Sequence, residues 1–310
     1  MLAAGCARSG PESSASRMPP DSTVATTATA AAETSGPDAG ELCRDASTGP
    51  TTFVYADRPG VDPDLTSVDL YLPAGCGPVP VVMWVHGGGW RRGDKASGYV
   101  ERKAAWAESL GAALVSVNYR LTTPDSGVRW PDHGEDVAAA VEWVQREGST
   151  VGLDGTKITL VGHSAGAHLV AITATDPELL TGAGADAGAV ECVVALDFSF
   201  DLASAPAQTL IVDAFGTNPE IIAAASPNVQ IERNGPPTAR FLVITRDGPR
   251  RVADAQSFVD LIGGAGGTAE LVDANPYSHN QVSSQLGDPD DRLVTPPVSE
   301  FVRTCTSGGS

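Results

Sequence analysis

Hydrophobic and polar positions follow two different patterns in this chain, and segments with the two patterns alternate along the sequence. Short apolar runs are each followed by a segment with apolar residues at helical spacing. The run Val79–Val85 (VPVVMWV) is nearly continuous, as in strands that are buried on both faces. Residues 132–147 instead place Val137, Val141 and Val144 on one helical face. Strands that alternate with helices predict an α/β fold with a mainly parallel central sheet and helices on both faces.

The same periods predict eight strands and several helices. The strands fall at residues 51–55, 66–71, 79–85, 113–118, 158–161, 192–196, 241–245 and 270–272, and helices at 99–110, 132–147, directly after residue 166, and at 252–262. The first two strands alternate as half-exposed strands do, so we expect them to pair antiparallel at one edge. Right-handed crossovers put the C-terminal ends of parallel strands on one side of the sheet, which is where open α/β sheets hold their sites.

Length and composition fit one large domain with an acidic surface. The chain has 310 residues, of which 42% are hydrophobic, and a formal net charge of -18. Such a charge repels nucleic acid phosphates and anionic membrane faces. We therefore expect no nucleic-acid partner, and the charge does not define the oligomeric state.

The first forty residues differ from the rest. Residues 1–6 (MLAAGC) resemble the end of a bacterial lipoprotein signal peptide, in which Cys6 would carry the lipid, although the charged leader region is missing. Residues 7–40 are rich in Ala, Thr, Ser, Pro and Gly and predict a disordered linker, which leaves residues 41–310 for the α/β domain. We expect an extracytoplasmic protein, lipid-anchored or secreted, that meets a membrane only through Cys6; an ordinary cysteine at a trimmed N-terminus is the alternative.

Four further cysteines form an even set. An even number in an exported chain predicts two disulfides, although free buried thiols remain an alternative. The pairs we favour are Cys43–Cys76 and Cys192–Cys305. The second pair would tie the last helix to a central strand.

The strongest chemical motif is Gly162-His163-Ser164-Ala165-Gly166, a G-x-S-x-G sequence between a predicted strand and a predicted helix. A sharp strand-to-helix turn needs glycines on both sides, and it exposes the serine Oγ at the start of a helix whose dipole favours developing negative charge. This context predicts that Ser164 is a nucleophile.

A glycine-rich loop follows the strand that ends at Val85. It reads His86-Gly87-Gly88-Gly89-Trp90. Consecutive glycines leave backbone N–H groups free to point at a substrate oxygen, and with the N–H of Ala165 they would form an oxyanion hole.

The general base and the acid should follow later in the chain, in the order Ser, acid, His. Only His279 of the five histidines comes after the last strand, so it is the predicted base. The acid is less defined: Asp247 is nearest the end of strand 241–245 and is our choice. The alternatives are Asp254 on the next helix and, after the preceding strand, Asp197 and Asp201.

These motifs together resemble the α/β-hydrolase superfamily, and within it the bacterial carboxylesterases and acetyl esterases related to hormone-sensitive lipase. The resemblance covers residues 51–303 and implies Ser164 as nucleophile, His279 as base, and Gly88, Gly89 and Ala165 as oxyanion donors, with Gly87 as a substitute for one of them. Relatives carry Gly-x-x-Asp-Pro before the base, but Pro249 stands where their aspartate would be. The departure concerns the acid and not the nucleophile.

The resemblance implies a serine esterase that cleaves short-acyl carboxylic esters of small molecules through an acyl-enzyme, with no cofactor and no metal. Amide or peptide hydrolysis uses the same machinery and is one alternative. A surface-tethered binding module that has lost catalysis is the other, since the acid departs from the family pattern.

Overall fold

The computed structural model describes residues 49–75, 77–202 and 209–306, which all lie within one compact unit, Ala39–Ser310. Cys6, Cys43, Cys76 and the linker 7–40 lie outside the described residues. The lipid anchor, the linker and the Cys43–Cys76 disulfide therefore stay predictions, as do the domain boundaries.

Within these described ranges, eight strands form a single sheet in the order β1-β2-β4-β3-β5-β6-β7-β8. Their bounds are β1 Thr51–Val54, β2 Ser67–Tyr71, β3 Val79–Val85, β4 Ala113–Val117, β5 Leu153–His163, β6 Val190–Leu196, β7 Arg240–Thr245 and β8 Ala269–Asp273. The strands from β4 to β8 run parallel, while β2 pairs antiparallel with both β1 and β4. All eight predicted strands are present, and the antiparallel edge is confirmed.

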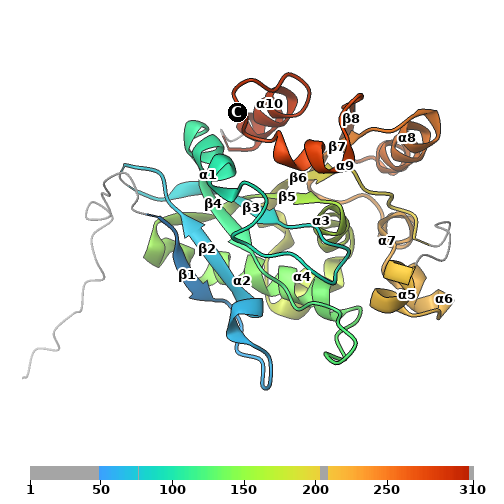
Figure 1. Cartoon of the computed structure of the whole chain (residues 1–310), viewed down its shortest axis with the longest axis horizontal. Helices are drawn as coiled ribbons and strands as arrows, with labels where there is room; N and C mark the ends of the chain where they lie inside the picture. The colour runs from blue at the N-terminus through green and yellow to red at the C-terminus, as the bar shows by residue number, and fades with distance from the viewer. Residues whose placement is uncertain (1–48, 76, 203–208, 307–310) are drawn as a thin grey trace, which may run out of the picture. The chain divides into compact units, whose positions relative to one another are not determined.

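Helices cover both faces of this sheet (Figure 1). Along β3, Val81, Met83 and Val85 pack into one apolar cluster, whereas Val82 and Trp84 pack into a second. The first cluster includes side chains of α2 (Asp132–Val151), α3 (Ala165–Thr175) and α8 (Pro249–Gly264), and the second those of α1 (Val100–Ser109) and α10 (Thr295–Thr306). Because β3 is buried on both faces, its sequence Val79–Val85 is a nearly continuous apolar run.

Shorter helices fill the connections that periodicity did not resolve. They are α4 (Pro177–Ala183), α5 (Thr209–Phe215), α6 (Pro219–Ala224), α7 (Pro227–Asn234) and α9 (His279–Ser284), with 3₁₀ turns at Pro63–Thr66 and Ala187–Ala189. Three of these helices, α5 to α7, lie between β6 and β7. Segments of six to eight residues span about two turns, too few to show a clear 3.6-residue period.

The Cys192–Cys305 disulfide is present and joins β6 to α10, with 6.2 Å between the two Cα atoms. It therefore fastens the C-terminal helix to the centre of the sheet, as predicted. Among the described helices, none is both long and apolar enough to cross a membrane.

Candidate active site

Ser164 stands at the sharp turn between β5 and α3. Its backbone has φ 55° and ψ −120°, and its N–H donates to the carbonyl of Leu196 at 2.9 Å. A Cβ at Gly162 would lie 2.3 Å from the oxygen of Gly166, and one at Gly166 would lie 2.1 Å from that of Val85. Only glycine fits on either side of the serine. A non-glycine residue at positive φ stores strain that the surrounding fold must hold, and such strain is concentrated at functional sites.

The glycine-rich loop after β3 lies directly beside this serine. A Cβ at Gly87 would approach the oxygen of His163 to 2.9 Å and Cβ of Ser164 to 3.2 Å. Gly88 and Gly89 both have positive φ, 125° and 62°, so the chain turns there in a conformation that favours glycine.

His86 holds the start of the loop. Its Nδ1 donates to the carbonyl of Gly87 at 2.8 Å, and its ring stacks on Tyr119 with 4.5 Å between centroids. Burial lowers the pKa of His86, so the ring is neutral and serves as a packed support. Trp90, at the end of the loop, is also buried and packs edge-on against Phe215, 4.8 Å between centroids.

His279 is the first residue of α9, and its position is fixed from two sides. Ser278 caps the helix in a reciprocal capping box with Gln281. His163 Nε2 donates to the carbonyl of His279 at 2.8 Å, and the two rings lie 4.5 Å apart. Burial lowers the pKa of His163 to about 4, so this neighbour of the nucleophile is neutral and acts as a donor to the backbone.

The acid that faces His279 is Asp197 and not Asp247. His279 Nδ1 lies 2.6 Å from Oδ2 of Asp197, whose side chain is fully buried at the end of β6. The side chain of Asp247 is 65% exposed and pairs with Arg246 at 3.0 Å. The structure therefore does not bring Asp247 to His279 as predicted: the loop after β7 turns its carboxylate outward, and the carboxylate beside His279 is the alternative that follows β6. Asp254 lies exposed on α8.

Two arginines that the sequence analysis did not single out also hold Asp197. Arg246 Nε donates to Oδ2 at 2.6 Å, and Arg251 donates to Oδ1 through Nη2 at 2.8 Å and Nε at 3.0 Å. Burial opposes ionisation of Asp197, but the hydrogen bonds from His279 and Arg246 and the charge of Arg251 outweigh it and lower its pKa to about 2. Two arginines that follow β7 thus bind a carboxylate that follows the neighbouring strand, β6.

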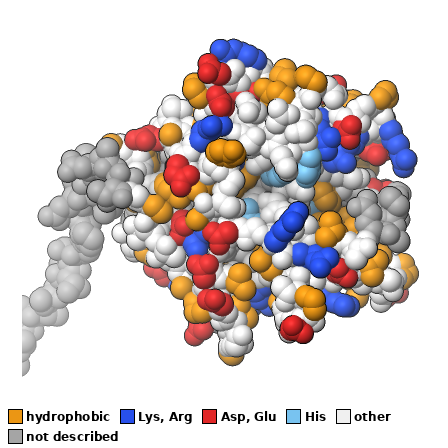
Figure 2. All heavy atoms as spheres, in the orientation of Figure 1, with side chains coloured by type: hydrophobic (Ala, Val, Ile, Leu, Met, Phe, Trp, Pro, Cys, Tyr) orange, Lys and Arg blue, Asp and Glu red, His pale blue; other side chains and the backbone are white. Residues whose placement is uncertain are grey.

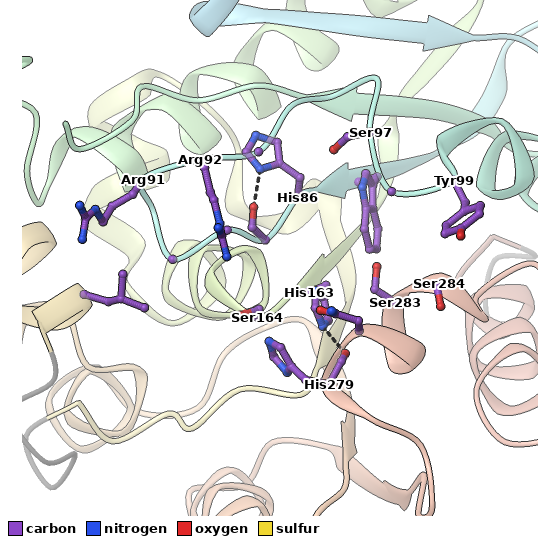
Figure 3. Close-up of a pocket in the computed structure, with 18 residues that line it drawn as sticks. His86, Arg91, Arg92, Ser97, Tyr99, His163, Ser164, His279, Ser283 and Ser284 are labelled. Atoms are coloured by element: carbon purple, nitrogen blue, oxygen red, sulfur yellow. Dashed lines mark hydrogen bonds between the residues drawn. The ribbon is translucent and has the colours of Figure 1, made fainter.

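Ser164 and His279 open into one pocket of about 1100 Å³ (Figure 3). The glycine-rich loop forms part of its wall, and Trp84, Tyr99 and Leu210 supply apolar surface. Figure 2 shows histidine side chains at the bottom of a hollow in this face of the molecule. The part of the chain that the structure describes contains no cluster of side chains suited to a metal ion.

The sheet is mainly parallel, with a serine at a strand-to-helix turn and a histidine after the last strand. A buried aspartate, which lies between the two in the chain, contacts the histidine. These features together define an α/β-hydrolase. The chain belongs to the family described as BD-FAE, whose model matches residues 68–258. The predicted relationship to the carboxylesterases of the hormone-sensitive lipase group is confirmed.

Two curated relatives come from Mycobacterium tuberculosis. The chain is 34% identical to esterase LipC over 204 residues, 60% of this chain and 48% of LipC. It is 29% identical to esterase LipQ over 238 residues, 72% of this chain and 55% of LipQ. The chain therefore spans about half the length of the curated relatives it matches.

Solved structures agree on the fold. Thermogutta terrifontis esterase 2 in its apo form matches with a TM-score of 0.65 at 22% identity, over 82% of this chain and 92% of that one. A truncated carbohydrate esterase from gut microbiota matches with a TM-score of 0.70 at 17% identity, over 86% of this chain and 99% of that one. These likenesses confirm the predicted α/β-hydrolase fold.

Proposed function

We propose that this chain is a serine esterase that cleaves short-acyl carboxylic esters, with Ser164 as nucleophile, His279 as general base and Asp197 as the acid. The observation that carries the proposal is the hydrogen bond between His279 and buried Asp197, beside a serine in a strained turn. A carboxylate on Nδ1 fixes the imidazole tautomer and leaves Nε2 to accept a proton. The esterase relatives favour esters over amides as the substrate class.

The proposed reaction has two halves. His279 Nε2 takes the proton of Ser164 Oγ while Oγ attacks the ester carbonyl, and the carbonyl oxygen becomes an oxyanion. The alcohol leaves with the proton from His279, and the acyl group stays on Oγ. Water then attacks the acyl-enzyme with the same base, which releases the carboxylic acid and restores the serine.

We assign the oxyanion hole to the backbone N–H groups of Gly88, Gly89 and Ala165. The support is positional: the glycine-rich loop lies against Ser164, and Ala165 begins α3 directly after it. Each such donor is worth about two to three powers of ten in rate. The N-terminus of α3 adds a favourable dipole for the developing charge.

The activity is tested with 4-nitrophenyl esters from acetate to dodecanoate, using the wild type and Ser164→Ala. We expect hydrolysis that is highest for short acyl chains and that falls by at least about a thousandfold in Ser164→Ala. A variant that folds by circular dichroism and keeps full activity would contradict the assignment. Turnover of anilides in place of esters would move the proposal to amide hydrolysis, and absence of both would favour a binding module.

We also propose that the protein acts outside the cytoplasm, anchored through Cys6 or secreted. The lipoprotein-like residues 1–6 support this, and so does the Cys192–Cys305 disulfide, because disulfides persist in oxidising compartments. Expression of the gene in its own reading frame with a labelled fatty acid tests the anchor. Label that depends on Cys6 is expected, and unlabelled protein in the cytosol would contradict the proposal.

A further inference from the structure

The pocket in front of Ser164 differs in charge from the chain as a whole. The sequence has 38 acidic and 20 basic residues. The described residues that line the pocket nevertheless include Arg91 and Arg92 and not one aspartate or glutamate. Figure 2 shows basic side chains close to the histidines of the hollow, while acidic side chains gather elsewhere on the same face. A cleft lined by one sign of charge concentrates ligands of the opposite sign.

The two arginines are not equivalent. Arg91 Nη1 donates to Asp213 at 2.8 Å, so its charge is already compensated. The side chain of Arg92 makes no hydrogen bond and no ion pair with any residue that the structure describes, and it is exposed. In Figure 3 the Arg92 side chain extends from the glycine-rich loop in the direction of Ser164 and His279.

The backbone of Arg92 is fixed although its side chain is not engaged. A Cβ at Gly88 would lie 1.8 Å from the Arg92 carbonyl oxygen, so the loop folds tightly back on this residue. A guanidinium on a fixed backbone presents its donors in a planar fork that matches a carboxylate. The position beside the proposed oxyanion donors means that a group bound there belongs to a molecule in the reaction site.

Apolar surface in the same pocket completes the description of a ligand. Tyr99 and Leu210 are 59% and 40% exposed, and both line the pocket, as does Trp84. Large apolar side chains that face solvent around a cleft mark a surface that a ligand covers. The pocket therefore suits a molecule with an apolar body and a negative group.

We propose that Arg92 binds a carboxylate carried by the substrate, so that this site prefers anionic esters over neutral esters of the same size. The inference rests on the proposed esterase function and adds the substrate class to it. A net charge of -18 repels an anionic ester at long range, so a local cation is needed for such a substrate to bind. A hydrogen-bonded charge pair between Arg92 and the carboxylate supplies that preference.

Two matched pairs of esters test the proposal, because the carboxylate could belong to either half of the substrate. For the alcohol half, 4-acetoxybenzoate is compared with neutral 4-acetoxybenzamide. For the acyl half, the mono-4-nitrophenyl ester of adipic acid is compared with 4-nitrophenyl hexanoate. We expect kcat/KM to favour the anionic member of at least one pair by about tenfold or more.

Substitutions at Arg92 then show whether this side chain causes the preference for anionic esters. Arg92→Gln is expected to lower kcat/KM for the preferred anionic ester by about tenfold, mainly through KM, and to leave the neutral ester within about twofold. Arg92→Glu should reverse the preference, and Arg92→Lys should keep part of it. Arg146→Gln removes the same charge from an exposed site on α2 and should change neither ester, which controls for the charge of the whole chain.

The outcomes separate the two proposals. If neutral esters are hydrolysed in a Ser164-dependent way but Arg92→Gln changes both members of each pair equally, the esterase function stands and the role of Arg92 is overturned. If the wild type hydrolyses neither member of either pair, the esterase function fails and the substrate preference fails with it. Raising the ionic strength should weaken the preference in the wild type, because salt screens an exposed charge pair.

Discussion

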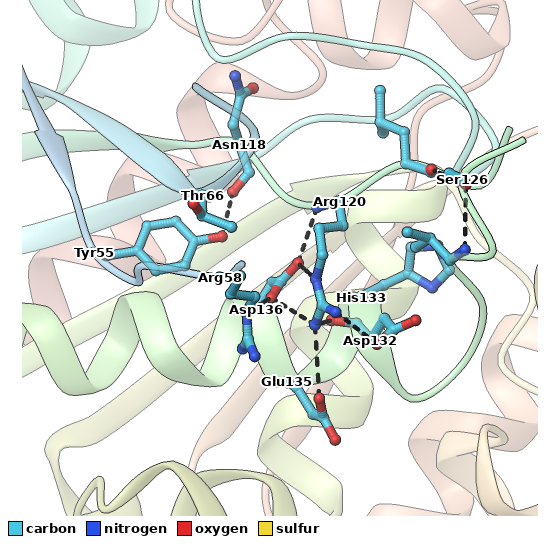
Figure 4. A network of polar contacts seen from close by, with 12 residues as sticks. Tyr55, Arg58, Thr66, Asn118, Arg120, Ser126, Asp132, His133, Glu135 and Asp136 are labelled. Carbon is cyan, nitrogen blue, oxygen red and sulfur yellow. Dashed lines mark hydrogen bonds and ion pairs between the residues drawn. The ribbon is translucent and has the colours of Figure 1, made fainter. Parts of the chain in front are cut away.

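Asp136 and Asp197 are two buried carboxylates, and each is held by two arginines. Asp136, on α2, accepts from Arg120 through Nε at 2.7 Å and Nη2 at 2.9 Å and lies 2.9 Å from Nε of Arg58 (Figure 4). Asp197 accepts from Arg246 and Arg251 at 2.6 to 3.0 Å. Both side chains are fully buried.

The surroundings of the two carboxylates differ in one decisive partner. Asp136 also accepts from the backbone N–H of Arg120, so each hydrogen bond and ion pair described for its side chain comes from an arginine. Asp197 has backbone φ 55° at the end of a strand and contacts His279, which opens into the pocket. Burial raises the pKa of Asp136 against the pull of Arg120, whereas the partners of Asp197 outweigh burial and lower its pKa to about 2.

Paired arginines alone therefore do not identify a catalytic carboxylate. Asp136 fastens the segment after β4 to α2, and its loss should be felt in stability. Asp197 contacts His279, the proposed general base, and its loss should be felt in rate. The expected effects of substitution separate the two roles.

The largest expected effect is the fall in kcat that Asp197→Asn causes. The amide cannot fix the imidazole tautomer or stabilise its cation, so kcat should fall by about 10⁴-fold, while the fold is kept. Steady-state kinetics on 4-nitrophenyl acetate measure the loss. A fall of less than about tenfold would show that Asp197 is not the acid.

Asp136→Ala should show the opposite pattern. It leaves the largely buried guanidinium of Arg120 without its main partner, and removing one member of a buried pair costs about 3 to 5 kcal/mol. Urea unfolding measures the loss. The fraction that remains folded should keep the wild-type kcat, and a rate loss like that of Asp197→Asn would erase the distinction between the two carboxylates.

A smaller effect is expected on stability in acid. The pKa of Asp197 is lowered from 3.8 to about 2, so its ionised form stabilises the fold above pH 4, and this contribution is lost as the pH falls to 2. The lost contribution is about 2 kcal/mol. The unfolding free energies at pH 5 and pH 2.5 should therefore differ more in the wild type than in Asp197→Asn. An equal difference in the two proteins would contradict the low pKa of Asp197.

The arginines beside Asp197 hold the carboxylate that contacts His279. Arg251→Gln removes two of the hydrogen bonds that Oδ1 of Asp197 accepts, so kcat for 4-nitrophenyl acetate should fall by about threefold to tenfold. Arg58→Gln, beside Asp136, is the matched control and should leave kcat within about twofold of the wild type. A loss of rate in the control and none in Arg251→Gln would reverse the assignment.

The smallest effect is expected for Asp247→Asn. Its carboxylate is mostly exposed and pairs only with Arg246 among the contacts described for its side chain, so kcat should stay within about twofold of the wild type. The same assay as for Asp197→Asn measures it. A thousandfold loss here would restore the original choice from the sequence.

The sequence predicted the fold and the sharp turn at Ser164 because each is encoded locally. Buried strands such as Val79–Val85 carry continuous apolar runs, and the turn at Ser164 needs glycines on both sides at fixed spacing. His279 could be predicted from chain order alone.

The carboxylate that contacts His279 could not be predicted in the same way because it depends on tertiary contact. Asp197 and Asp247 both follow a buried strand directly, and the sequence does not show which carboxylate points toward His279. Arg246 and Arg251 flank Pro249, which stands where relatives carry the aspartate, and two cations there were the available signal for a carboxylate on the neighbouring strand. That Arg92 has no partner among the residues that the structure describes likewise depends on contacts between distant segments, such as the pairing of Arg91 with Asp213.

The reaction of the protein with paraoxon tests the central claim most directly. Attack by Ser164 Oγ on phosphorus expels 4-nitrophenolate and leaves a diethylphosphoryl group on the serine. The account predicts one equivalent of 4-nitrophenolate per folded chain, the added mass on the peptide that carries Ser164, and a reaction at least a hundredfold slower in Asp197→Asn but unchanged in Asp247→Asn. Labelling of another residue, or none in the folded wild type, would contradict it.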